Sequence, residues 1–218
     1  MAEVYRRFKE TETQVPILTN EQIDELAQNY AVGYCSNILE KPRPLDIDDF
    51  MEFYLGLEVE VHFLSHNGMY LGVTVFEDTD FFPIYNLFKN QAEFISIKGG
   101  TVIIDELQDR GYEPRTRFTK AHECGHFIMH KDFFQGSSIC LYSKCESAII
   151  ADDLKVIERQ ADRFAAGLLV PRDAVIDMSK RMWRYGYEDD EIIDCIQETF
   201  NVSRQAAEYR LKDLDLIG

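Results

Sequence analysis

Two histidines four residues apart, in the arrangement His122-Glu123-x-x-His126, lie in a segment with helical patterning. At 3.6 residues per turn, side chains four apart stand on one face of a helix, one turn from each other. Their ring nitrogens can then bind a single Zn²⁺ at about 2.0–2.1 Å. The segment has no interrupting proline, and its small and apolar residues would form a buried side: Phe118, Ala121, Cys124, Gly125 and Met129. The alternative is a pair of helix histidines that only form hydrogen bonds.

Glu123 lies roughly 100° around the helix from His122, so it need not bind the metal. It can instead reach a water molecule beside the metal and act as a general base. The motif therefore predicts two metal ligands and one catalytic carboxylate. A catalytic zinc site also needs a third protein ligand and an open position for water.

The next expected helix offers that third ligand. Glu158 and Asp162 are again four residues apart, and both border its apolar face. We assign Glu158 as the third ligand, and Asp162 as the carboxylate that accepts the other ring N–H of a metal-binding histidine. For Asp162 the alternative is a solvated carboxylate paired with Arg159 or Arg163.

Composition restricts the compartment and the partners. The 218 residues carry a formal net charge of −16, and 45% of them are apolar, as in an ordinary globular protein. Such acidity argues against a nucleic-acid-binding surface, which depends on Lys and Arg. No apolar stretch approaches the roughly 20 residues that span a bilayer, and no secretory signal is expected. Five scattered cysteines indicate free thiols in a reducing cytoplasm. The sequence does not predict an oligomeric state.

The order of the patterns predicts an α+β fold. Residues 1–15 are expected to form a polar tail, followed by a single domain over 16–218. Within that domain, helices and a small sheet are expected over 16–114, metal-site helices over 115–170, and a helical cap over 171–218.

Local patterns place the elements. A capping box, Thr19 with Gln22, starts the first helix. Further helices are expected over 46–55, 115–130, 153–170, 173–184, 189–200 and 203–214. Strands are expected over 59–63, 69–76, 92–97 and 101–104. The last two strands flank Gly99-Gly100, which predicts a hairpin.

Two blocks, RFTKAHECGHFIMH and ERQADRFAAGLLVP, resemble the helices RFTxAHELGHxxLH and ExxANxFAAxLLMP of the ImmA/IrrE family of zinc metallo-endopeptidases. The segment VSRQAAEYRL is similar to a third element of that family, and the resemblance covers roughly residues 95–211. It implies a zincin-like core in which His122, His126 and Glu158 bind zinc and Glu123 is the catalytic base. The sequence departs at Asp162, where the family usually has Asn. Glu followed by Asp one turn later is also similar to the third-ligand helix of gluzincins.

His130 lies one further turn along, and the family often has histidine there. It is expected to support the site or to bond a carbonyl group; a role toward the substrate is the alternative. His62 and His66 are expected in a strand and a turn, unrelated to the site. The spacing of Cys140 and Cys145 permits metal binding, but no second pair matches them.

The expected reaction is hydrolysis of a peptide bond, in which zinc polarises the scissile carbonyl and Glu123 moves a proton from water to the leaving amine. The oxyanion needs a further donor, and four tyrosines qualify by chemistry alone: Tyr112, Tyr142, Tyr185 and Tyr187. In zincins an edge strand pairs with the extended substrate, and we expect the strand at 101–105 to do so.

The resemblance implies a substrate class as well. Family members cleave helix-turn-helix repressors and thereby derepress mobile-element or stress genes, and an acidic chain would match a repressor with a basic surface. Three functions remain open: a selective zinc endopeptidase, a zinc-containing module that antagonises a repressor without cleaving it, and a DNA-binding regulator built on the last two helices. The presence of Glu123 favours the first, and the acidic residues over 189–198 oppose the third.

Overall fold

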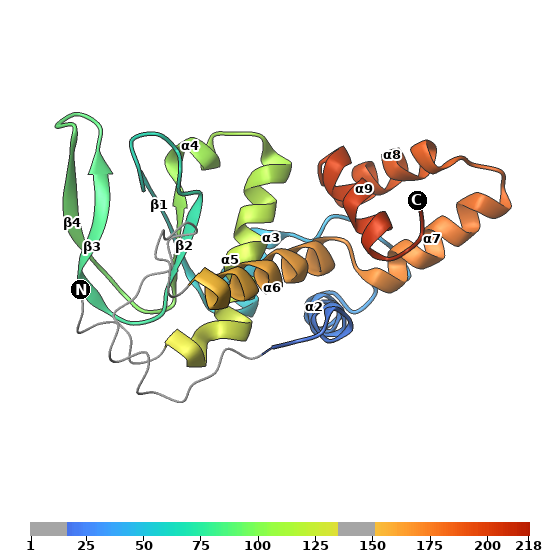
Figure 1. Ribbon diagram of the computed structural model, residues 1–218, viewed down its shortest axis with the longest axis horizontal. Helices are drawn as coiled ribbons and strands as arrows, with labels where there is room; N and C mark the ends of the chain where they lie inside the picture. Colours follow the sequence, from blue (N-terminus) through green and yellow to red (C-terminus); the bar gives the residue numbers. More distant parts are fainter. Residues whose placement is uncertain (1–16, 135–150) are drawn as a thin grey trace.

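Figure 1 shows the computed structural model of the chain, which describes residues 17–134 and 151–218. The tail expected at 1–15 lies outside these ranges, as do Cys140, Tyr142 and Cys145. The described helices are α2 (Asn20–Tyr34), α3 (Ile47–Asp49), the π-helical turn η1 (Phe50–Tyr54), α4 (Glu106–Asp109), α5 (Glu113–Phe134), α6 (Ala151–Leu169), α7 (Arg172–Arg184), α8 (Asp189–Phe200) and α9 (Arg204–Asp213). The described strands are β1 (Glu58–His62), β2 (Gly72–Val75), β3 (Thr79–Asn86), β4 (Gln91–Ile97) and β5 (Thr101–Asp105). This order confirms the α+β class.

The helices begin and end close to the predicted residues. α2 starts at the predicted capping box: the N–H of Gln22 donates to Thr19 Oγ1 at 3.3 Å, and the N–H of Thr19 donates to Gln22 Oε1 at 2.9 Å. Pro171 separates α6 from α7, because proline has no N–H to continue a helix. The helix predicted over 46–55 divides into α3 and η1, and the sequence patterns do not predict α4.

The strands form two sheets. In the three-stranded sheet, β5 is central, parallel to β1 and antiparallel to β2. The prediction that the strand at 101–105 is an edge is therefore wrong: β5 pairs on both sides, and all five of its residues are buried. β3 and β4 form a separate antiparallel pair, which projects at one end of the molecule (Figure 1).

The prediction of a hairpin at Gly99-Gly100 is also wrong. These glycines connect the two sheets, because β4 pairs with β3 and β5 pairs with β1 and β2. Gly100 has a φ of +87°, and its N–H donates to the carbonyl oxygen of Val75 at 2.7 Å. A Cβ on Gly99 would lie 2.7 Å from the carbonyl oxygen of Phe76, so only glycine allows this close approach. The unpredicted partner of β4 is β3, whose Pro83 is typical of edge strands.

The largest core lies where the helices meet the three-stranded sheet. Its fully buried side chains include Phe50, Ile104, Phe164 and Phe200. α6 packs against both α2 and α5, and α5 also packs against β2. Each large apolar side chain contributes roughly 1.5–3 kcal/mol when buried, so this core fixes the position of the helices that carry the motif. Among the described residues, no helix is long and apolar enough to cross a membrane.

Candidate metal centre

α5 and α6 approach each other closely at Gly125. A Cβ on Gly125 would lie 3.1 Å from the Cα of Ala161, so a larger residue would push the two helices apart. Glu158 lies three residues before Ala161, about one turn away on α6. The close contact therefore brings Glu158 over the face of α5 that carries His122 and His126.

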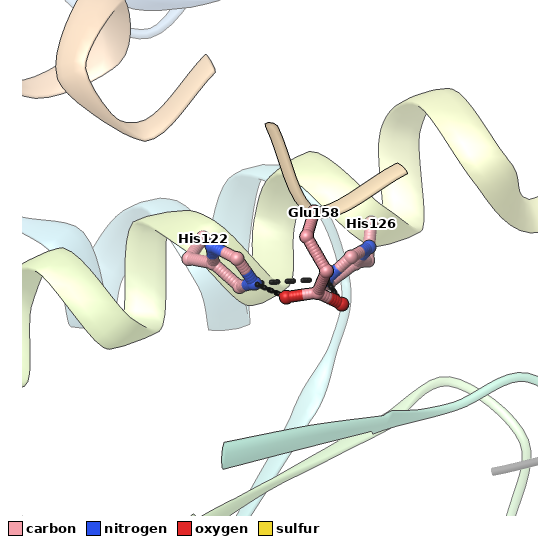
Figure 2. A group of neighbouring side chains, drawn as sticks. All are labelled: His122, His126 and Glu158. Atoms are coloured by element: carbon pink, nitrogen blue, oxygen red, sulfur yellow. Dashed lines mark hydrogen bonds and ion pairs between the residues drawn. The ribbon is translucent and has the colours of Figure 1, made fainter. Parts of the chain in front are cut away.

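The side chains of the three predicted ligands converge at this contact (Figure 2). The Nε2 atoms of His122 and His126 lie 2.9 Å apart. Oε2 of Glu158 lies 3.3 Å from Nε2 of His122, and Oε1 lies 3.4 Å from Nε2 of His126. Both histidines are buried, and the three residues form a group that could hold a metal ion. The structure thus brings together the three residues predicted as ligands.

The spacing of these atoms suits a tetrahedral zinc ion. With bonds of about 2.0–2.2 Å, two ligands of such an ion lie about 3.3 Å from each other, close to the separations in the site. Two imidazoles and one carboxylate are also a donor set of catalytic zinc sites. The residues therefore fit the ion, while their role as ligands and the identity of the metal stay predictions.

The charges in the cluster favour a cation. Burial opposes the ionisation of Glu158, but hydrogen bonds to His122 and His126 outweigh it and hold the pKa of Glu158 well below its usual range. Burial also opposes the protonation of His122, yet hydrogen bonds to Asp162 and Glu158 raise the pKa of His122 to about 10. A metal ion that binds here would replace a proton with a larger positive charge.

Asp162 contacts the motif from the far side of the ring of His122. Its Oδ1 lies 2.9 Å from Nδ1 of His122, so Nδ1 donates to Asp162. Nε2 is then the nitrogen that can offer its lone pair to a metal ion once the ion displaces its proton. Of the two alternative partners of Asp162, Arg163 pairs instead with Asp24 and Asp213, and Arg159 forms no ion pair with it. The contact is the one that the predicted supporting role of Asp162 requires.

His130 is fully buried beside His126. Its Nδ1 lies 3.2 Å from Nδ1 of His126, and its Nε2 lies 3.1 Å from Oε1 of Gln160 on α6. An amide oxygen only accepts, so Nε2 of His130 carries the proton and Nδ1 accepts from His126. Burial lowers the pKa of His130 to about 4, which keeps this ring neutral at pH 7. His130 therefore contacts a predicted ligand through one ring nitrogen and the side-chain carbonyl of Gln160 through the other.

Glu123 lies beside the ligands and is buried, with an exposed fraction of 1%. The hydroxyl of Thr74 on β2 donates to Oε2 of Glu123 at 2.7 Å. Oε1 faces Gly72 on the same strand, where a Cβ would lie 2.8 Å from it. Burial raises the pKa of Glu123, and the charges of His126 and His122, with the hydrogen bond from Thr74, oppose that rise. A buried carboxylate with a raised pKa suits a general base.

A cavity of about 300 Å³ adjoins these groups. Its lining includes His122, Glu123 and Glu158, together with Met69 and Leu71 from the segment before β2. Three of the four candidate oxyanion donors belong to the described residues, and none of them lines this cavity: Tyr112, Tyr185 and Tyr187. The structure therefore selects no tyrosine for that role.

The other histidines of the described residues lie outside the cluster. His62 Nε2 lies 2.7 Å from Oε2 of Glu60 within β1. The ring of His66 packs against Tyr85, with centroids 5.7 Å apart. Cys124, between the two motif histidines, is fully buried in the core, where burial raises the pKa of its thiol.

Sequence reasoning misses Gly72, Thr74 and Gln160. The first two lie on a strand far from the motif, and no local pattern connects them with it. Gln160 carries a weak signal, because it is a polar residue directly beside Ala161 on the apolar face of the third-ligand helix. Its full burial shows that the position belongs to the interior.

A family model described as Peptidase_M78, the IrrE N-terminal-like domain, matches residues 71–212, well over half of the chain. The matched range begins just before β2, contains α5 and α6 whole, and ends within α9. It therefore includes the strand that holds Glu123 as well as both helices of the cluster. A comparison with curated proteins gave no match.

Proposed function

The chain belongs to the Peptidase_M78 family of IrrE N-terminal-like domains, and we propose that it is a zinc-dependent endopeptidase. One observation carries the proposal: two imidazoles and one carboxylate converge within 2.9 to 3.4 Å of one another, beside a buried glutamate. A structural zinc site has four protein ligands and needs no base. The cluster has three among the described residues, and it adjoins a cavity that can admit a substrate.

Each residue has a task in this proposal. A zinc ion held by His122, His126 and Glu158 would polarise the scissile carbonyl and lower the pKa of a water molecule toward about 7. Glu123 accepts a proton from the attacking water, whose oxygen forms a bond to the carbonyl carbon. As the C–N bond breaks, Glu123 passes that proton to the nitrogen of the leaving amine. The hydrogen bond from Thr74 orients the Glu123 carboxylate for both transfers.

We infer that the substrate is a helix-turn-helix repressor with a basic surface, cleaved to derepress mobile-element or stress genes. Family resemblance supports this class, and the net charge of −16 favours approach to a basic protein over approach to DNA. The reaction would take place in the cytoplasm. Cys35, Cys124 and Cys195 are free thiols, as a reducing compartment maintains them.

The test is incubation of the purified, zinc-loaded chain with the helix-turn-helix repressor encoded beside its gene. Defined fragments are expected, and a zinc chelator should prevent them until zinc is restored. Glu123→Gln has nearly the same size and should keep zinc while cleavage falls by about 10²–10⁴-fold. Tight binding of the repressor without a cut by the wild-type chain would support the non-cleaving antagonist instead. Failure of the chain to retain zinc would overturn the proposal.

A further inference from the structure

A groove of about 1050 Å³ runs between α5, α6 and α9, beside the metal centre. The groove and the cavity at the metal centre share Arg115, Phe118 and Asp162 in their linings, so the two are continuous. Arg115, Phe118 and His122 recur at spacings of three and four on α5, which places them on one stripe of the helix. The groove therefore leads from the metal centre toward the N-terminal end of α5.

This groove is basic although the chain is strongly acidic. Its lining contains five basic side chains and two acidic ones. Three of the basic side chains already have acidic partners. Arg163 and Arg210 both pair with Asp24, and Lys212 pairs with Glu208.

The other two basic side chains of the groove are Arg115 and Arg159. Both are exposed, and neither guanidinium has an ion pair or hydrogen bond within the described ranges. Arg115 lies two turns before His122 on α5, and Arg159 directly follows Glu158 on α6. The neighbouring acid, Asp162, is in contact with the ring of His122. The two helices of the metal centre thus each place beside the path that leads to it an arginine that has no acidic partner among residues 17–134 and 151–218.

We propose that Arg115 and Arg159 bind an acidic side chain of the substrate, Asp or Glu, about three residues from the scissile bond. Arg115 and His122 are seven positions apart, a separation of about 10.5 Å along the helix, which an extended peptide covers in about three residues. Guanidinium groups bind carboxylates through paired, charge-assisted hydrogen bonds. This inference rests on the proposed function, because it names the substrate chemistry of the same site.

An acidic residue near the cut bond is compatible with a repressor that is basic as a whole. Net charge acts over a Debye length of roughly 8 Å and affects the approach of the two proteins. The groove contacts only the few residues that enter it. The charge of the whole chain and the charge of the groove therefore select different features of one substrate.

The test uses the zinc-loaded chain, a library of random unfolded peptides, and mass spectrometry of the new termini. Asp and Glu should be enriched at the third or fourth residue from the cleaved bond, on one side of it. Arg115→Glu should lower kcat/KM for acidic peptides by roughly ten- to a hundredfold and shift the preference toward Lys and Arg. Arg184→Glu makes the same charge change at an exposed position of α7 outside the groove, and should leave the preference unchanged. A uniform or basic preference of the wild-type chain would overturn the inference.

Peptide binding separates this inference from the proposed function. Zinc-loaded Glu123→Gln should retain acidic peptides from the same library, and adding Arg115→Glu should abolish that selection. Acid-selective binding without any cleavage by the wild-type chain would refute the endopeptidase and support the groove. Cleavage without selection for acidic peptides would support the endopeptidase and refute the inference about the groove. Retention of a single-stranded oligonucleotide, with no retention of acidic peptides, would also overturn the inference.

Discussion

The hydroxyl of Thr74 donates a hydrogen bond of 2.7 Å to Oε2 of Glu123, and so joins the sheet to the helix of the metal centre. The same hydroxyl oxygen lies 3.1 Å from the backbone carbonyl oxygen of Glu123. Both side chains are buried, so no bulk water can take the place of this contact. The direction of the Glu123 carboxylate therefore depends on β2 as well as on its own helix.

Thr74→Val should remove this hydrogen bond with little change in volume. A hydrogen bond to a charged group contributes roughly 1.5–3 kcal/mol, so kcat should fall about tenfold or more. Because the bond stabilises the ionised form, its loss raises the pKa of Glu123. The base must be ionised to act, so the acidic limb of the pH–kcat profile should move to higher pH. Thr74→Ser keeps the hydroxyl and should preserve the limb. If the acidic limb of Thr74→Val stays at the wild-type pH, the hydrogen bond does not lower the pKa of Glu123.

Gly72→Ala tests the second constraint on the same carboxylate. The added methyl carbon would lie 2.8 Å from Oε1 of Glu123 and 3.0 Å from Cγ2 of Thr119, so the carboxylate must move. A misplacement of about 1 Å can cost a hundredfold in rate, and we expect kcat to fall toward that extent. Zinc content should stay at the wild-type level, because the methyl group contacts no predicted ligand. Full activity of the variant would show that Glu123 has room to adjust.

Glu158→Gln tests the third ligand. The amide has nearly the same shape as the carboxylate but no charge, so zinc measured after dialysis should fall from about one ion per chain to little or none. Asp162→Asn, one turn along α6, is the matched control. Its amide oxygen can still accept from Nδ1 of His122, so most of the zinc should remain. Equal zinc retention by Glu158→Gln and the wild-type chain would exclude Glu158 as a ligand.

Local spacing accounts for what the sequence predicts well. His122 and His126 share a helical face by periodicity, and the apolar stripe of the next helix predicts that Glu158 lies beside them. Both predictions depend only on the periodicity of a single helix and on the burial of the apolar faces of the two helices against each other. The structure brings the three side chains together in the expected way.

Contacts between distant segments account for what the sequence does not predict. The contact between Thr74 and Glu123 joins residues 49 positions apart, and no local pattern records it. β5 pairs with β1 and β2 and not with β4, and the chain passes from one sheet to the other at Gly99 and Gly100. A glycine pair predicts a turn, but the partner of each strand is decided by the packing of the whole sheet.

Gln160→Met should weaken zinc binding through His130. Without the amide oxygen, the ring of His130 can adopt the other tautomer, in which Nδ1 carries the proton and no longer accepts from His126. Loss of such a supporting contact typically lowers metal affinity by about 10–100-fold. Competition with a chromophoric chelator gives the affinity, and ring ¹⁵N shifts give the tautomer. A weaker affinity with unchanged ring shifts would assign the effect to packing instead.

Asp24 on α2 forms a buried charge network with two other helices. It lies 2.7 Å from Nη1 of Arg210 on α9 and 2.6 Å from Nη2 of Arg163 on α6. Asp24 and Arg210 are each only 2% exposed, so Asp24→Ala would leave a buried guanidinium without its main counter-charge. The free energy of unfolding in urea should fall by about 3–5 kcal/mol. Arg204→Ala breaks exposed ion pairs with Asp190 and Asp194 and should change the free energy of unfolding little. Similar losses in both variants would mean that burial does not strengthen the network. Because Asp24 lines neither the cavity nor the groove, the folded variant should bind zinc as the wild-type chain does.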